Sequence, residues 1–236
     1  MKIVITGASS EIGLSIAKKF IGNEHELILQ CYNNSLNFKG LLEKNKNIKI
    51  VSCDFTNNES LNLFLNELSH VDILINVAAI TKTDLLVSLT DEDIKNMMQV
   101  NVFAPTLICR AVMPYMTSKR NGIIVNISSI AATKGNRGQT VYGGTKGFME
   151  SFTRSLAAEY GAKGIRANCV APGAIEAGSL KSLINVASDE IKKNVALNRF
   201  GTVENISDAV FYLCGDNASF INGQVIHVDG GFMRGV

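Results

Sequence analysis

Seven short apolar runs, rich in Ile, Val and Leu, recur along the chain, and stretches with helical periodicity lie between most of them. The runs cover residues 2–6, 26–31, 48–52, 72–76, 122–128, 165–171 and 224–228. Strands that are apolar on both faces are typical of parallel sheets that helices cover on both sides. The sequence therefore predicts an α/β fold, a single Rossmann-type doubly wound parallel sheet with helices on both faces.

The helical patterns follow residue 13 and recur around residues 61–68, 91–117, 142–160 and 204–214. A chain of 236 residues is long enough for two small domains, but α/β chains of this length often form one. Because no repeat, low-complexity segment or charge run marks a linker, we expect one domain over residues 1–236. Residues 174–199 lack a strand signal, and they are interpreted as a flap over the substrate or as an ordinary pair of surface helices.

Charge and hydropathy exclude two classes of partner. The formal net charge of +2 and the charged fraction of 19% give no global attraction to nucleic acid. The apolar run 71–80 is too short to span a bilayer and contains Asp72 and Asn76. Met1 and Lys2 lead directly into the first apolar run, without the features of a secretory signal. We therefore expect no nucleic-acid partner, no membrane association and a cytoplasmic location.

Cysteine and histidine residues give no sign of a disulfide framework or a metal site. The five cysteines are odd in number and lack C-x-x-C spacing, so we expect reduced, mostly buried thiols at Cys31, Cys53, Cys109, Cys169 and Cys214. No spacing typical of metal ligands or of a catalytic triad relates the three histidines, His25, His70 and His227. They are interpreted as structural, and no G-x-S-x-G nucleophile competes as a catalytic centre.

Tyr142 and Lys146 lie four residues apart in a predicted helix, so they share one face of it. An ammonium beside a phenol favours the phenolate, and the pKa of Tyr142 is therefore expected below its usual value of about 10. Ser129 precedes Tyr142 by thirteen residues and ends a predicted strand, where its hydroxyl can bind the same substrate oxygen. The pattern predicts an enzyme in which Tyr142 donates a proton and Ser129 polarises a carbonyl.

The spacing of Tyr142 and Lys146 is weak evidence when it is taken alone. Tyr115 and Lys119 are also four residues apart, but Val102, rather than a hydroxyl residue, lies thirteen residues before Tyr115. This second pair lies at the end of a helical pattern, just before a predicted strand. Tyr115 is therefore interpreted as structural.

The turn after the first predicted strand indicates a nucleotide site. Gly7 and Gly13 let the backbone pass close to a pyrophosphate at a helix N-terminus, where unpaired N–H groups favour anions. Glu11 places an acid near this proposed phosphate site. The alternative interpretation of Glu11 is an acid in the first turn that stabilises the helix dipole.

Three further polar residues have both a functional and a structural interpretation. Asp54, after the third predicted strand, can accept a hydrogen bond from an adenine amine, or residues 54–57 can simply provide an N-cap. Asn76 ends the fourth predicted strand, where doubly wound sheets bind ligands. Asn101 lies inside an apolar helical run and needs a buried polar partner or a bend in the helix, unless it is a plain surface residue.

In their order along the chain, these motifs resemble the short-chain dehydrogenase/reductase family over essentially the whole sequence. They are residues 6–13 (TGASSEIG), Asp54, residues 76–79 (NVAA), Asn101, Ser129, residues 142–146 (YGGTK) and residues 172–175 (PGAI). Within that family, the tail, with residues 197–201 (LNRFG), 223–225 and 229–231, looks like the 3-oxoacyl-[acyl-carrier-protein] reductases. Related sugar and alcohol dehydrogenases share much of this tail.

The resemblance implies a catalytic tetrad of Asn101, Ser129, Tyr142 and Lys146. Tyr142 would donate the proton and Ser129 would orient the carbonyl. Lys146 would bind the nicotinamide ribose and tune Tyr142, while Asn101 would hold a water that relays protons to Lys146. The resemblance also implies a nicotinamide cofactor that contacts Gly7, Ser9, Ser10, Ile12, Tyr32, Asn33, Asp54, Phe55, Asn76, Ala78, Tyr142, Lys146, Pro172, Gly173 and Ile175.

Cofactor preference is expected from the end of the second predicted strand. Residues 30–35 read QCYNNS, so no carboxylate is present there to bind a ribose 2′-hydroxyl or to repel a 2′-phosphate. We therefore predict NADPH rather than NADH. The sequence departs from the family at Glu11, in place of a glycine, at Ala79, in place of a glycine, and at Ala177, in place of a threonine. These departures bear on cofactor affinity and preference.

The implied function is NADPH-dependent reduction of a 3-oxoacyl thioester on acyl carrier protein to the 3-hydroxyacyl thioester, in fatty acid or polyketide-like biosynthesis, by a homotetramer. The resemblance also implies that Arg120 and Lys163 form a basic patch for the carrier; the alternative for each is a solvated loop cation. A second enzyme hypothesis is an NAD(P)-dependent dehydrogenase of a free sugar, steroid or secondary alcohol. A third, a non-catalytic nucleotide-binding regulator, has no reason to keep four catalytic side chains.

Overall fold

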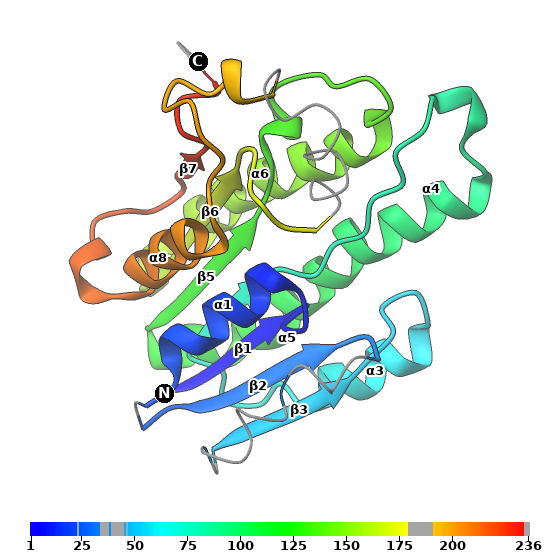
Figure 1. Ribbon diagram of the computed structural model, residues 1–236. Helices are drawn as coiled ribbons and strands as arrows, with labels where there is room; N and C mark the ends of the chain where they lie inside the picture. The colour runs from blue at the N-terminus through cyan, green and yellow to red at the C-terminus, as the bar shows by residue number, and fades with distance from the viewer. Residues whose placement is uncertain (23, 34–37, 39–44, 46, 179–190, 234–236) are drawn as a thin grey trace.

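Seven parallel strands form one sheet in the order β3-β2-β1-β4-β5-β6-β7. This computed structural model describes all residues except 23, 34–37, 39–44, 46, 179–190 and 234–236 (Figure 1). The strands are β1 (Lys2–Thr6), β2 (Glu26–Cys31), β3 (Ile48–Ser52), β4 (Ile73–Asn76), β5 (Gly122–Ile127), β6 (Ile165–Pro172) and β7 (Val225–Val228). The predicted Rossmann-type sheet is confirmed, and the strand bounds differ from the expected ones by at most one residue.

Helices cover both faces of the sheet. The helices α1 (Glu11–Phe20) and α8 (Val203–Cys214) pack against each other on one face. The helices α3 (Asn58–Asn66), α5 (Ala104–Lys119) and α6 (Thr140–Tyr160) lie on the other face (Figure 1).

Strand β1 shows why the inner strands must be apolar on both faces. Its alternate residues enter different cores: Ile3 and Ile5 pack toward α1 and α8, whereas Val4 packs toward α5. All three side chains are 0% exposed. Burying one such side chain contributes roughly 1.5–3 kcal/mol, so a polar residue on either face would lose that contribution.

The order of the strands places the ligand crevice. The chain winds outward from β1 to β3 and then returns to β4 on the opposite side of β1. In such sheets the crevice opens at the carboxyl ends of the strands, where the winding direction changes. The carboxyl ends of β1 and β4, with β5 beside them, are therefore the expected binding edge.

The predicted helical run over residues 91–117 is divided into three parts. Helix α4 (Asp91–Met98) leads into a π-helical turn, Gln99–Phe103, and α5 follows it directly. A π-helical turn widens the helix by one residue, and such turns are frequent at functional sites. Asn101 is at the centre of this turn.

The cysteines, the apolar helices and the predicted flap can also be compared with the sequence. All five cysteines are buried and free, as predicted. Among the described residues, no helix combines the length and the apolar character that a membrane span requires. The middle of the predicted flap, residues 179–190, lies outside the described residues, while its described start pairs with the segment before α8 through a bridge between Ile175 and Gly201.

Candidate active site

Strand β5 and helix α6 bring the predicted catalytic side chains together. Ser129 follows the end of β5, and Tyr142 and Lys146 lie in the first turns of α6. The Ser129 side chain acts on the Tyr142 phenol as a hydrogen-bonding partner that lowers its pKa. The Lys146 ammonium donates to the main-chain oxygen of Ile127 at 2.8 Å and lies 5.7 Å from the centre of the Tyr142 ring. A carbonyl oxygen held between Ser129 and Tyr142 would therefore meet two hydroxyl donors.

A close backbone approach lets α6 reach Ser129. Ser129 caps a short 3-10 helix, Ile130–Ala132, and its hydroxyl accepts a hydrogen bond from the Ala131 N–H at 3.2 Å. Gly143 packs against this turn: a Cβ atom added to it would lie 2.7 Å from the Ala131 oxygen. The glycine after Tyr142 therefore allows the close spacing between Tyr142 and Ser129.

The expectation of a lowered pKa for Tyr142 is wrong for this structure. Burial raises the pKa of Tyr142, and the hydrogen bond from Ser129 only partly opposes this effect. Lys146 is also buried, and burial lowers its own pKa to about 8. Removal from water penalises both the phenolate and the ammonium, so the sequence spacing alone gave the wrong sign.

Asn101 has the buried partners that its position inside an apolar helix demands. Its side-chain oxygen accepts from the Ile80 N–H at 2.9 Å, and its amide donates to the Ile80 oxygen at 2.8 Å. The same amide donates to the Thr145 hydroxyl at 3.1 Å. Asn101 thus fastens the π-helical turn to the segment after β4 and to α6. The water implied at Asn101 stays a prediction.

Thr145 is part of this arrangement but was not recognised in the sequence. Its hydroxyl is buried, donates to the Tyr142 main-chain oxygen at 2.7 Å and accepts from Asn101. It links helix α6, which carries Tyr142, to the π-helical turn. The available signal was a hydroxyl residue directly before Lys146 in the predicted helix.

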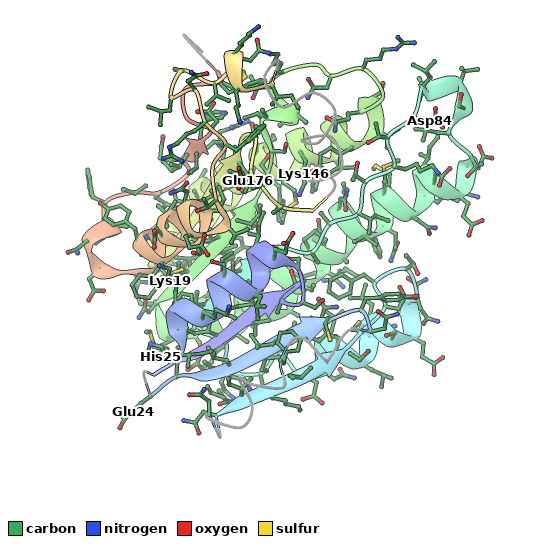
Figure 2. All side chains as sticks on the ribbon, in the orientation of Figure 1. Lys19, Glu24, His25, Asp84, Lys146 and Glu176 are labelled. Atoms are coloured by element: carbon green, nitrogen blue, oxygen red, sulfur yellow. The ribbon has the colours of Figure 1, made fainter. Side chains whose placement is uncertain are left out.

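Tyr115 lies far from this centre, at the other end of β5. It is near the C-terminal end of α5, which precedes β5, and its ring meets His70 edge-on at 5.0 Å. Its neighbour Lys119 pairs with Asp72 at 2.6 Å. The structural interpretation of Tyr115 is consistent with this packing. Figure 2 shows the contrast between the two ends: Lys146 lies at one end of the sheet, while Glu24 and His25 lie at the other.

The turn after β1 has the shape required to hold a phosphate. Gly7 has φ +61, and a Cβ atom there would lie 2.7 Å from the backbone of Ala78. A Cβ on Gly13 would lie 2.3 Å from the Gly7 oxygen. The Ser10 hydroxyl caps α1 by accepting from the Gly13 N–H at 3.0 Å. The turn therefore brings a helix N-terminus to the carboxyl edge beside β4, as a nucleotide site needs.

Two buried polar side chains hold this turn, and neither was assigned a role from the sequence. Gln30 accepts from the Gly7 N–H at 2.8 Å and donates to the Cys53 oxygen at 2.9 Å, so it joins the ends of β1, β2 and β3. The Thr6 hydroxyl accepts from the N–H groups of Val77 and Ala78. The available signal was a polar residue at or near the end of an apolar strand: Thr6 is the last residue of β1 and Gln30 is the second-to-last residue of β2.

The expected cofactor residues all lie at the carboxyl edge of the sheet, although their side chains differ in availability. Tyr32 and Asn33, after β2, are exposed. Asp54 uses one carboxylate oxygen to accept from the N–H and hydroxyl of Thr56, at 2.8 and 2.7 Å. Asn57, rather than Asp54, is the N-cap of α3. Both hydrogen bonds from Thr56 go to the same oxygen of Asp54, Oδ1.

Two of the expected contacts have side chains that are engaged in the core. Phe55 is 5% exposed and packs against Phe64 at 5.8 Å. The Asn76 amide donates to the Asn126 side chain at 2.9 Å, and its own oxygen is buried without a partner among the described residues. A cofactor contact at Phe55 or Asn76 would therefore involve the main chain.

The end of β6 completes the edge. Gly173 follows Pro172 and approaches Asp229 so closely that an added Cβ would lie 2.6 Å from it. Ile175 is buried. Beyond it, the Gly178 N–H donates to a carboxylate oxygen of Glu11 at 2.8 Å. Glu11 therefore bridges the start of α1 to the segment after β6, a role that neither sequence interpretation included.

Arg120 and Lys163 lie together, but at the amino ends of the strands. Arg120 precedes β5 and has φ 52, and its guanidinium donates to the Ala162 oxygen at 2.9 Å. Lys163 is exposed in the turn before β6, the strand that pairs with β5. The two cations therefore form one patch at the edge opposite Ser129.

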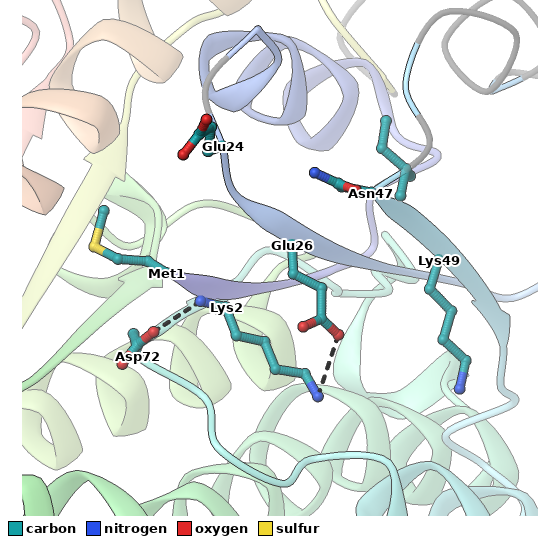
Figure 3. A pocket seen from close by; sticks show the side chains of 8 residues that line it. Met1, Lys2, Glu24, Glu26, Asn47, Lys49 and Asp72 are labelled. Atoms are coloured by element: carbon teal, nitrogen blue, oxygen red, sulfur yellow. Dashed lines mark hydrogen bonds and ion pairs between the residues drawn. The ribbon is translucent and has the colours of Figure 1, made fainter.

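A cavity of about 620 Å³ also opens at the amino ends, between β1, β2 and β3. Figure 3 shows its lining, which includes Lys2 paired with Glu26 and Asp72 accepting from the Lys2 N–H. It lies at the opposite edge of the sheet from Ser129, Tyr142 and Lys146. Among the described residues, no cluster of His, Cys, Asp or Glu is arranged to hold a metal ion.

Comparisons with known proteins agree with this geometry. A family model described as enoyl-(acyl carrier protein) reductase matches residues 7–233. The 3-oxoacyl-[acyl-carrier-protein] reductase FabG of Chlamydia trachomatis (serovar D) is 34% identical over 236 residues, covering 97% of this chain and 95% of that protein.

Two solved structures extend the comparison to the whole fold. ElxO with NADP bound is 28% identical, covers 98% of each chain and has a TM-score of 0.87. A structure with bound NADP from Agrobacterium tumefaciens, named as a 2-deoxy-d-gluconate 3-dehydrogenase, is 26% identical, covers 98% of this chain and 95% of its own, and has a TM-score of 0.89. The chain belongs to the short-chain dehydrogenase/reductase family of oxidoreductases.

Proposed function

We propose that this protein reduces a 3-oxoacyl thioester on acyl carrier protein to the 3-hydroxyacyl thioester, with NADPH as the reductant. One observation supports the substrate: the similarity to the chlamydial 3-oxoacyl-[acyl-carrier-protein] reductase spans 97% of this chain. The arrangement of Ser129, Tyr142 and Lys146 at the end of β5 supports the reaction type. A cytoplasmic location is part of the same proposal.

The side chains at the end of β5 have distinct roles in this reaction. The bound nicotinamide supplies the hydride that the carbonyl carbon receives. Ser129 donates a hydrogen bond to the carbonyl oxygen, and Tyr142 transfers its phenolic proton to that oxygen as negative charge develops on it. The buried ammonium of Lys146, held by Ile127, favours the tyrosinate that this transfer leaves. A proton from solvent then restores Tyr142.

The residues at the carboxyl edge fit a dinucleotide. Gly7 and Gly13 would let the pyrophosphate approach the start of α1, and Asp54 would accept from the adenine amine. Tyr32 and Asn33, exposed after β2, would face the adenosine ribose. With no carboxylate among them, a 2′-phosphate meets no repulsion, which favours NADPH.

A turnover assay tests both the substrate and the cofactor. We expect the enzyme to oxidise NADPH in the presence of an acetoacetyl thioester, with a kcat/KM at least about tenfold higher than with NADH, a difference that corresponds to about 1.4 kcal/mol. The same assay should include free ketones, sugars and secondary alcohols. Equal or faster turnover with NADH would contradict the cofactor assignment.

A second function competes with the carrier-bound substrate. A structural neighbour with a TM-score of 0.89 is named as a 2-deoxy-d-gluconate 3-dehydrogenase, and one fold can carry sites for many different substrates. Turnover of a free sugar or secondary alcohol, without turnover of the thioester, would establish this alternative.

The carrier hypothesis involves a homotetramer. Arg120 and Lys163 lie at the amino ends of β5 and β6, so they can meet a carrier at an active site only if that site belongs to a neighbouring subunit. Exposed aromatic side chains would supply subunit contacts: Phe103 is 49% exposed, Phe211 is 42% exposed and Phe220 is 102% exposed. Such groups are enriched in interfaces.

Charge reversal tests the carrier patch. We expect Arg120→Glu with Lys163→Glu to lower kcat/KM for the carrier-bound substrate by about tenfold, because an acidic carrier is then repelled, and to have less effect at high salt. A small uncharged thioester should react at the wild-type rate. Lys163→Glu alone keeps the hydrogen bond from Arg120 to Ala162, so it separates charge from local structure. Equal losses with both substrates, or no loss, would exclude docking at this patch.

A further inference from the structure

Helix α6 contains a buried carboxylate that the proposed reaction does not use. Glu150 follows Lys146 by one helical turn and is 7% exposed, and Ser128, which faces it from the end of β5, is 2% exposed. The Ser128 hydroxyl donates to a Glu150 carboxylate oxygen at 3.0 Å. Burying a carboxylate lowers the stability of the fold unless the carboxylate is hydrogen-bonded. The hydrogen bond from Ser128 is therefore needed at this position.

This contact joins strand β5, which Ser129 follows, to helix α6, which carries Tyr142 and Lys146. Ser128 directly precedes Ser129, and Ile127 accepts from the Lys146 ammonium at 2.8 Å. Successive residues at the end of β5 are therefore bonded to side chains one turn apart on α6, the helix that presents Tyr142. Loss of either hydrogen bond would let β5 shift against α6 and so change the distance from Ser129 to Tyr142.

Strand β6 closes the space beside Glu150. Cys169 is 0% exposed. Its burial, and to a smaller extent the negative charge of Glu150, raise the pKa of its thiol to about 12, while the charge of Lys146 opposes this rise. The thiol therefore stays neutral beside the carboxylate. The Ser128 hydroxyl has one alternative acceptor, the main-chain oxygen of Lys146 at 3.2 Å.

We propose that Glu150 is a positioning residue: by accepting from Ser128 it fixes the end of β5 against α6 and so sets Ser129 in register with Tyr142. This inference rests on the proposed ketoreduction, but it does not depend on the carrier or on the acyl chain. Its direct consequence concerns the hydrogen bond between Ser129 and Tyr142. That bond lowers the pKa of Tyr142 against the raising effect of burial, and it weakens when Ser129 moves.

Two substitutions at Glu150 separate the hydrogen bond from its surroundings. Glu150→Leu removes the acceptor but keeps a side chain of similar volume. The Ser128 hydroxyl can then turn to the main-chain oxygen of Lys146 at 3.2 Å. We expect kcat to fall about tenfold, with KM and the thermal midpoint little changed, since a small misplacement of reacting groups is costly. Glu150→Gln keeps an acceptor oxygen and should retain most of the wild-type kcat. Glu159→Leu, at an exposed position of the same helix, is the matched control and should have no effect.

A double-mutant cycle shows whether Glu150 acts through Ser128. Ser128→Ala should lower kcat as much as Glu150→Leu does, and the double variant should lose no more than either single variant. Additive losses would show that the two residues act separately and would overturn the proposal. A kcat for Glu150→Gln as low as that for Glu150→Leu would also overturn it.

A measurement on the cofactor-free protein gives a second readout. The titration of Tyr142 is followed by phenolate absorbance, with Tyr142→Phe subtracting the other tyrosines; Ser129 and Lys146 are the polar groups that face it. We expect Glu150→Leu to raise the pKa of Tyr142 and Glu150→Gln to leave it unchanged. An unchanged pKa in Glu150→Leu would overturn the proposal. If the wild-type enzyme reduces no 3-oxoacyl thioester, the proposed function fails, and this titration still decides the role of Glu150.

Discussion

Replacing Tyr142 by Phe should lower kcat by about 10²- to 10⁴-fold, the usual contribution of general acid catalysis. The hydroxyl acts only when charge develops on the substrate oxygen, so cofactor binding should stay close to that of the wild type. The ring also remains in place, and Lys146 keeps its hydrogen bond to Ile127. Steady-state kinetics with the thioester and a fluorescence titration with NADPH measure the two quantities.

Tyr115→Phe is the matched control, because Tyr115 has the same spacing to a lysine but lies at the opposite end of β5. It should keep the wild-type kcat. A Tyr142→Phe enzyme with near wild-type kcat would contradict the assignment of Tyr142 as the proton donor and make Tyr115 a candidate for that role.

The pH dependence of reduction follows from the same geometry. Burial holds the pKa of Tyr142 above its ordinary value, so the phenol keeps its proton at neutral pH and can donate it. Activity in the reducing direction is therefore expected to fall only on the alkaline side. In the proposed reaction, Tyr142 therefore acts as a protonated acid whose phenolate is stabilised after transfer, rather than as a side chain that is already ionised.

Apolar strands and helical periodicity were enough to predict the fold. The five inner strands β2, β1, β4, β5 and β6 are buried on both faces, as Ile3, Val4 and Ile5 show in β1, whereas the edge strands β3 and β7 are only partly buried. The composition of an inner strand therefore reports its position directly. The proximity of the candidate catalytic side chains was also predictable, because the end of a strand and the first turns of the following helix are close in sequence. Ser129, Tyr142 and Lys146 come from one such unit.

The supporting interactions were not predictable, because they join segments that are distant in the sequence. Gln30 joins three strand ends, and Glu11 reaches the N–H of Gly178 across the binding edge. The π-helical turn around Asn101 interrupts a helical pattern that reads as continuous. Whether a pKa rises or falls depends on burial, and a sequence pattern does not give the burial of Tyr142.

The spacing between strand β5 and helix α6 should be the most sensitive dimension of the site, and adjacent glycines allow it to be tested. Gly143→Ala places a methyl group 2.7 Å from the Ala131 oxygen, whereas the same methyl on Gly144 meets nothing within 4 Å. We expect Gly143→Ala to lower kcat by about ten- to a hundredfold, because the turn capped by Ser129 must move away from Tyr142.

Gly144→Ala should keep the wild-type kcat and stabilise the fold by about 0.5–1 kcal/mol, since alanine is the better helix former. Both glycines lie in α6, so this gain in helix propensity applies equally to the two variants. A loss of kcat confined to Gly143→Ala therefore comes from the contact with Ala131. Urea denaturation measures the stability of each variant. If Gly143→Ala matches Gly144→Ala in both kcat and stability, the spacing between Ser129 and Tyr142 does not limit the reaction.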